Sequence, residues 1–175
     1  MSEHDTRPRP IPTEYMDRYR EILLGDEICR LLNNDDDFVA VMRIHAYIES
    51  LVDRLLHTRL VPGKGLPRRM DFNSRYELAV ALGLIDEYLI PALQGLSELR
   101  NHLAHNHSAT VESDDIAKLR KSLKSDLKHS FEELLTEEPI DLGSDDYSKL
   151  LLRRLLLAIY SFIQSDLISA TVETT

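Results

Sequence analysis

The sequence predicts an all-α protein, a bundle of about six helices joined by short links. Apolar residues recur at spacings of three and four residues through most of the chain, which is the periodicity of amphipathic helices. No segment alternates between polar and apolar residues for more than a few positions, so no strand is expected. Cap and turn residues, such as the proline- and glycine-rich stretch 62–67, separate the periodic segments.

Each expected helix has its own signals. The amphipathic pattern is clearest from Phe38 to Leu60, and the break 33–35 before it supplies an N-cap. Asn73 or Ser74 caps a short helix that Gly83 stops, and Pro91 suits the first turn of the next helix. The expected helices span residues 15–32, 38–60, 74–82, 91–106, 113–134 and 145–170, with a turn of helix from residue 85.

The last two helices carry further expectations. Residues 113–134 are expected to form one helix, with Lys121, Lys124 and Lys128 together on its polar side. Its buried side would consist of Ile116, Leu119, Leu123, Leu127, Phe131 and Leu134. The helix 145–170 is apolar around most of its circumference, which is typical of a central helix or of half an interface between chains. We favour the central helix, and the two interpretations are compatible.

Length and composition predict one compact domain over residues 14–175, after a proline-containing tail over 1–13. The chain is 43% hydrophobic and 29% charged, as is ordinary for soluble globular proteins. Cys29 is the single cysteine and has no internal disulfide partner, which fits a reducing compartment. The first residues lack the features of a signal peptide, and the apolar run 155–162 is far shorter than the ~20 residues that span a bilayer. We therefore expect a soluble cytoplasmic protein.

The charge is acidic overall but unevenly distributed. A net charge of −9 disfavours non-specific binding to nucleic acid. Two segments, 59–75 and 118–128, each hold five basic residues against one acidic residue. These segments are either solvated faces without a ligand or positive patches that hold phosphate or RNA. The candidate phosphate-binding residues are Arg68, Arg69, Lys121 and Lys124.

Common catalytic motifs are absent from the sequence. It contains no phosphate-binding P-loop, no Gly-x-Ser-x-Gly, no Cys-x-x-Cys and no His-Glu-x-x-His, and it has no tryptophan for stacking on bases. The exception is 98–107, where His102, His105 and His107 follow Arg100 at the end of a helix. A metal site there lacks a secure third ligand, so we expect neither a metal nor a cofactor. Histidines at a helix C-terminus are also compatible with a purely structural role.

A third interpretation combines Arg100 with His105. An arginine can grip a phosphate with two parallel hydrogen bonds, and a histidine titrates near neutrality. Together they would cleave RNA without a metal, His105 accepting the 2′-hydroxyl proton while Arg100 holds the phosphate. Five residues apart on a helix, they point about 140° apart. They would converge only if the helix loosens near Ala104 or if a second copy contributes to the same cleft.

The motif Arg100-Asn101-x-x-Ala104-His105, together with the upstream segment 72–85, resembles the mannitol operon repressor (MltR) family. It also matches the Arg-x4-6-His signature of the wider HEPN superfamily. The resemblance implies an all-α bundle, commonly dimeric, in which the arginine and histidine of two subunits face one cleft. It places Arg100, Asn101 and His105 at the motif positions. Many members of the superfamily are metal-independent endoribonucleases of toxin–antitoxin or defence systems, while others bind or regulate.

Two functions follow from this resemblance. The first is a regulator that acts through protein partners, because no helix-turn-helix with a basic recognition helix can be identified. The second is an endoribonuclease that uses Arg100 and His105 at a homodimer interface. Glu49 is expected to pair with Arg100, either to orient it for catalysis or as a structural contact. Where toxin members often carry a tyrosine, two residues after the motif histidine, this chain has His107.

Overall fold

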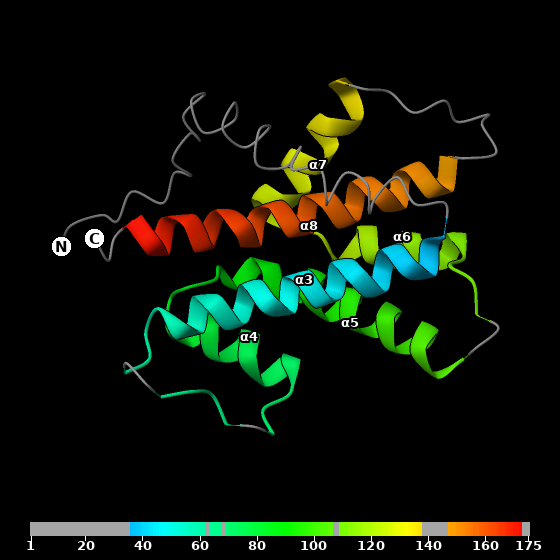
Figure 1. Cartoon of the computed structure of the whole chain (residues 1–175). Helices are drawn as coiled ribbons and strands as arrows, with labels where there is room; N and C mark the ends of the chain where they lie inside the picture. Colours follow the sequence, from blue (N-terminus) through cyan, green and yellow to red (C-terminus); the bar gives the residue numbers. More distant parts are fainter. Residues whose placement is uncertain (1–35, 62–63, 68, 107–108, 138–146, 173–175) are drawn as a thin grey trace. The chain divides into compact units, whose positions relative to one another are not determined.

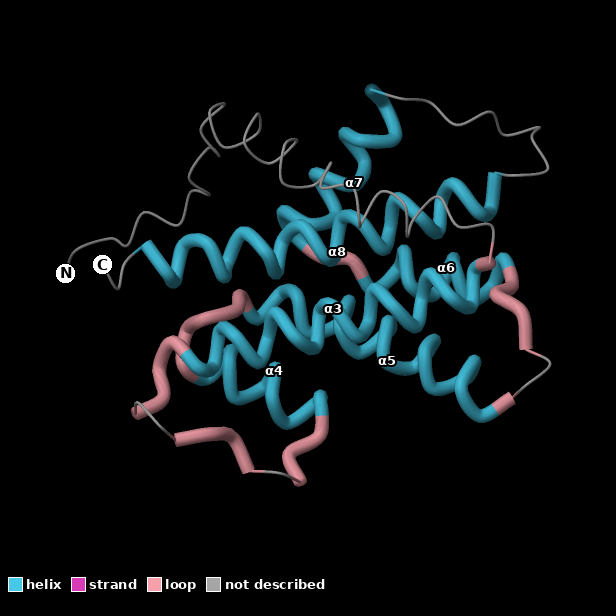
Figure 2. Tube along the Cα trace, viewed as in Figure 1, coloured by secondary structure: helices cyan, strands magenta, loops and turns pink. Residues whose placement is uncertain are grey.

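The computed structural model describes residues 36–61, 64–67, 69–106, 109–137 and 147–172. These residues form six α-helices and one short 3-10 helix, with no strand among them, which confirms the predicted all-α class (Figures 1 and 2). All of these helices belong to one compact unit, Asn34–Thr175. The expected helix 15–32, the tail 1–13 and Cys29 lie outside the described residues. The helices are α3 (Asp37–His57), α4 (Phe72–Ala81), η1 (Glu87–Leu89), α5 (Ile90–His105), α6 (Ser113–Ser122), α7 (Ser125–Glu137) and α8 (Tyr147–Val172).

Most of the described side chains of helix α8 are buried or partly buried, as its apolar circumference predicts. The helix packs against α3, α6 and α7, and α3 runs beside it in the same direction (Figure 1). An ion pair between Arg153 Nη2 and Asp37 Oδ1, 2.7 Å long and largely buried, joins the beginnings of the two helices. The buried side chains of α8 include Leu152, Leu155, Leu156, Ile159 and Ile163.

Helix α3 begins and ends slightly earlier than the sequence predicts. Its N-cap is Asp36, whose carboxylate accepts a hydrogen bond from the Val39 backbone N–H at 3.2 Å, rather than a residue of the break 33–35. It ends at His57, and the C-cap residue Thr58 donates its hydroxyl to the Leu55 carbonyl, 2.6 Å away. The predicted apolar stripe is buried except at its first member, Phe38, which is 40% exposed.

The helices α4 and α5 begin and end near the predicted cap, glycine and proline residues, with one correction. The N-cap of α4 is Asp71, which accepts a hydrogen bond from the Ser74 N–H at 2.8 Å, so the expected caps Asn73 and Ser74 lie inside the first turn. Gly83 follows the end of α4 with a φ of +68°, a conformation that favours glycine. Proline lies in the first turn of α5, as predicted.

The single helix predicted over 113–134 is wrong, because the chain breaks between Ser122 and Ser125. The Ser122 hydroxyl bonds back to the Leu119 carbonyl at 2.6 Å, Leu123 is extended, and Ser125 has a φ of +45°. The break lets α6 pack against α5 and α8 while α7 packs against α8. Five of the six predicted buried residues are buried, and the side chain of Leu134 lies outside the described residues.

Candidate functional site

The motif arginine and histidine lie near the C-terminal end of α5. The apolar stripe predicted for this helix is buried, namely Leu93, Leu96, Leu99 and Leu103. Arg100 is half-buried, and its Nη1 donates a hydrogen bond to Asn101 Oδ1 at 3.0 Å. His105 is the last residue of α5 and its side chain is exposed. Both motif side chains therefore reach the surface of the bundle.

Arg100 and His105 are not brought together within one chain. Helix α5 continues unbroken through Ala104 to His105, so the loosened turn that convergence would need is not formed. Five residues apart on a regular helix, the two side chains leave it about 140° apart. A common cleft for the pair would therefore require a second copy of the chain.

A buried histidine lies beside Arg100 on the facing helix. His45 of α3 is 6% exposed, and its Nε2 lies 3.4 Å from the Ser97 hydroxyl of α5, one turn before Arg100. The ring also meets Phe72 edge-on, with centroids 4.8 Å apart. Burial, followed by the charge of Arg100, lowers the pKa of His45 to about 4. Near neutral pH this histidine is therefore an uncharged neighbour of Arg100.

Glu49 pairs with Arg75 and not with Arg100, which corrects the expected contact. Arg75 Nη1 donates to Glu49 Oε1 at 3.0 Å and to both Asp53 oxygens at 3.2 Å, while its Nε donates to the Met70 carbonyl at 3.0 Å. Glu49 and Asp53 are one turn apart on α3, on the side that packs against α4. Arg75 of α4 therefore reaches both carboxylates, while Arg100 lies near His45. Glu49 is a structural contact between α3 and α4.

The predicted phosphate-binding residues do not gather around the motif. Arg68 lies outside the described residues, while Arg69 and Lys124 are exposed. In the other basic segment Lys118 pairs with Asp114, their charged atoms 2.6 Å apart. Among the described residues, no pocket brings Arg69 or Lys124 together with Arg100 or His105.

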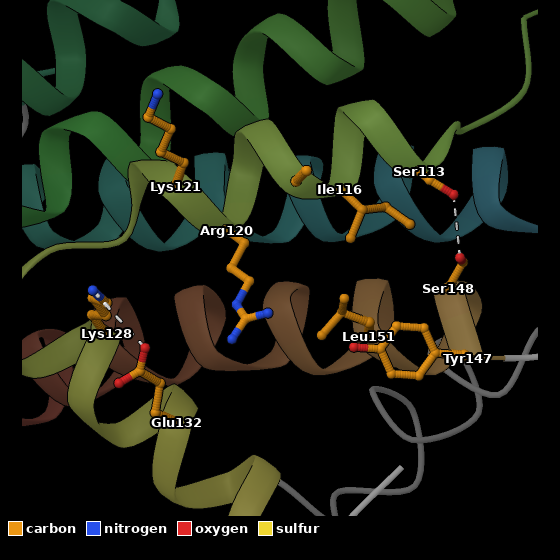
Figure 3. A pocket seen from close by; sticks show the side chains of 10 residues that line it. Ser113, Ile116, Arg120, Lys121, Lys128, Glu132, Tyr147, Ser148 and Leu151 are labelled. Atoms are coloured by element: carbon orange, nitrogen blue, oxygen red, sulfur yellow. Dashed lines mark hydrogen bonds and ion pairs between the residues drawn. The ribbon is translucent and has the colours of Figure 1, made fainter. Parts of the chain in front are cut away.

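Lys121 lines a pocket that the sequence did not predict. This α6–α8 pocket lies between α6, α7 and the first turns of α8, with a volume of about 520 Å³ (Figure 3). Its polar lining consists of Ser113, Arg120, Lys121, Lys128, Glu132, Tyr147 and Ser148. The basic segment 118–128 was the only signal for it, because Tyr147 and Ser148 join the pocket through the tertiary fold.

The described residues contain no group of three or more His, Cys, Asp or Glu side chains placed to hold a metal ion. His102 instead lines a pocket together with the acidic residues Glu112, Asp114 and Asp115. Among the helices that can be described, none combines the length and apolar character needed to cross a membrane. Comparisons with models of protein families, with curated proteins and with solved structures found no match to this chain.

Proposed function

We propose that this chain is a cytoplasmic regulatory protein, similar to the mannitol operon repressor branch of the HEPN superfamily, that acts through protein partners. Its sequence supports this through the motif Arg100 to His105 and the upstream segment 72–85. The observation that carries the proposal is the unbroken helix α5, on which Arg100 and His105 diverge. A single chain therefore does not assemble the two groups that cleavage of RNA would need.

The charge distribution favours a protein partner over direct reading of DNA. Helix α6 holds three basic residues close together, but Lys118 pairs with Asp114 and Arg120 turns toward the α6–α8 pocket. Of the three basic residues, only Lys121 is left to contact DNA. A recognition helix needs several side chains that reach the edges of the DNA bases and further cations that contact the phosphates. The acidic remainder of the chain would repel the duplex.

Two measurements test this proposal. Fluorescence anisotropy with a labelled duplex DNA at near-physiological salt should show no saturable binding. A strain that lacks this chain should show altered transcript levels. The wild type and the Lys121→Gln/Lys124→Gln variant should restore these levels equally well. Tight, salt-dependent DNA binding that this double variant abolishes would contradict regulation through a protein partner.

The second candidate is the endoribonuclease. One observation favours it: Arg100 forms no ion pair with a carboxylate in the described part of the chain, and its neighbour His45 is uncharged near neutral pH. Its positive charge is therefore not neutralised, and His105 is exposed. Both side chains would be available to a homodimer in which each cleft takes Arg100 from one subunit and His105 from the other.

Mixing two inactive variants tests this second candidate. Arg100→Ala and His105→Ala should each be inactive as homodimers if the cleft is shared. A heterodimer of the two keeps one complete cleft, because each subunit supplies the residue that the other lacks. Activity that returns on mixing would support the shared cleft, whereas two active single variants would exclude it.

A further inference from the structure

We propose that the α6–α8 pocket binds a small phosphate monoester and that Arg120 is its principal anchor. The pocket is separate from the motif on α5, since neither Arg100 nor His105 lines it. This inference therefore goes beyond the proposed function. It rests on how Arg120 is held, on the charges and hydroxyl groups that surround it, and on the size of the pocket.

Arg120 packs against an aromatic ring on one side and faces the pocket on the other. Its guanidinium carbon lies 5.9 Å from the centre of the Phe131 ring, and Phe131 is fully buried. This cation–π contact, close to the limit of about 6 Å for such contacts, favours this orientation of the side chain without using its N–H groups. In Figure 3 the guanidinium points into the space between α6 and α8. In the described part of the chain Arg120 forms no ion pair, so its planar fork is available for two parallel hydrogen bonds to a phosphate.

A second cation faces the pocket from α7. Lys128 Nζ lies 3.9 Å from Glu132 Oε1, and both side chains are at least half exposed. An exposed pair at this distance contributes little stability, so an incoming phosphate can compete with Glu132 for Lys128. Lys121 lines the same pocket, with its ammonium turned away from Arg120 (Figure 3). The lining thus holds three cations and one carboxylate on a chain whose net charge is −9.

Hydroxyl groups line the other end of the pocket. The Ser113 and Ser148 oxygens lie 3.4 Å apart, which is long for a hydrogen bond between hydroxyls and easily exchanged for a better partner. The Tyr147 side chain points toward the pocket beside Leu151 in Figure 3. Hydroxyls at this end would bond to the oxygens of a polar group that is joined to the phosphate. Ile116 and Leu151 form an apolar wall beside them.

The size and charge of the pocket favour a small ligand over a polymer. A volume of about 520 Å³ lies within the range of small-molecule sites. A polynucleotide would need many more cations along its path, because its affinity comes from the neutralisation of successive phosphates. Two anchoring cations beside hydroxyl groups suit one terminal phosphate on a compact polar body.

Calorimetric titration of the full chain in a phosphate-free buffer tests this site. Glucose 6-phosphate is the main probe, inorganic phosphate the minimal probe and glucose the uncharged control. We expect saturable binding of glucose 6-phosphate, weaker binding of inorganic phosphate and none of glucose. Arg120→Gln should weaken the binding of glucose 6-phosphate about tenfold or more, because the phosphate loses a charged hydrogen-bond donor.

Matched variants separate the site from general charge and from folding. Lys118→Gln removes one positive charge from the same helix, but outside the pocket, and should leave the Kd unchanged. Arg120→Lys keeps the charge without the fork and should give an intermediate Kd. If Arg120→Gln fails to fold, Tyr147→Phe is the substitute variant and should weaken glucose 6-phosphate several-fold while leaving inorganic phosphate less affected.

Three results would overturn the proposal. The first is the absence of saturable binding of either phosphate probe up to about 10 mM. The second is equal binding of glucose 6-phosphate by wild type and Arg120→Gln. The third is binding of a single-stranded RNA oligonucleotide without binding of glucose 6-phosphate. All of these variants keep Arg100 and His105. A failure here therefore leaves the proposed function untouched, and a failure of the proposed function leaves this site untouched.

Discussion

The Ser97 hydroxyl of α5 lies 3.4 Å from Nε2 of His45 of α3, inside the helical bundle. This contact joins the two helices three residues, or about one helical turn, before Arg100, the motif arginine. Since burial holds the pKa of His45 at about 4, the ring stays neutral where the unfolded chain would already be protonated. The stability of the bundle should therefore depend on pH through this residue.

The free energy of unfolding should fall on acidification because of His45. The folded-state pKa of His45, about 4, lies below its ordinary value of 6.5, so between these values the unfolded chain binds the extra proton. The contribution of His45 is complete above pH 6.5 and is lost as the pH falls toward 4, by about 3 kcal/mol in total. Urea unfolding of wild type and His45→Gln from pH 4 to 8 measures it. His129→Gln, at an exposed site, is the control and should retain the dependence. An identical pH dependence in wild type and His45→Gln would show that His45 is not held neutral.

Asp166 should act in the opposite direction. One carboxylate oxygen of Asp166 is buried without a hydrogen-bond partner among the described residues. Burial, with the nearby charge of Asp86, raises its pKa from 3.8 to about 7. The folded chain then holds the proton between these values, so stability contributed by Asp166 falls as the pH rises from about 4 to 7.

The variant Asp166→Asn should therefore stabilise the protein by about 2–4 kcal/mol at pH 8 and have little effect near pH 4. Urea unfolding at the two pH values measures the difference. Glu77→Gln is the matched control, because Glu77 is exposed on α4, and it should change stability little at either pH. A stabilisation that is equal at pH 4 and pH 8 would contradict the raised pKa.

The Arg75 ion pairs should be worth about 1 kcal/mol in stability. Arg75 bridges Glu49 and Asp53, but about a third of each carboxylate side chain is exposed, so water screens the attraction. Arg75→Gln should lower the free energy of unfolding by this amount, and Arg69→Gln, at an exposed site, should not.

A double-mutant cycle identifies the partner of Glu49. Coupling should appear between Glu49→Gln and Arg75→Gln and should be near zero between Glu49→Gln and Arg100→Gln. Coupling of Glu49 to Arg100 and not to Arg75 would contradict the observed pair and support the Glu49–Arg100 contact that the sequence predicts.

The break between α6 and α7 makes a further prediction. Ser125 has a φ of +45°, which costs free energy for a residue with a side chain. Ser125→Gly should raise the free energy of unfolding by about 0.5–1 kcal/mol. Ser130→Gly, inside α7, should lower it by about 1 kcal/mol. Chemical unfolding compares the two variants, and a continuous helix through position 125 would make both destabilising.

The sequence predicted the helices well because their apolar spacing survives in the fold. It predicted one helix over 113–134 since Leu119, Leu123 and Leu127 keep helical spacing, and the break preserves their burial while changing the path of the backbone. Spacing alone does not register a bend of this kind.

Pairings between helices were harder to predict than the helices themselves. The sequence predicted Arg100 as the partner of Glu49, whereas the actual partner, Arg75, depends on which helix packs against that side of α3. The α6–α8 pocket has the same origin, because Arg120 and Tyr147 are distant in sequence and meet only when α6 and α8 pack together. His45 carried no sequence signal beyond its place on an apolar face.

The most direct test of the proposed function is cleavage of single-stranded RNA in EDTA by the wild type beside His105→Ala, with both proteins shown to be folded. We expect no cleavage above background by either protein at concentrations where the chain is fully associated. Cleavage by the wild type that His105→Ala abolishes would contradict a non-catalytic regulator and would identify His105 as a catalytic residue.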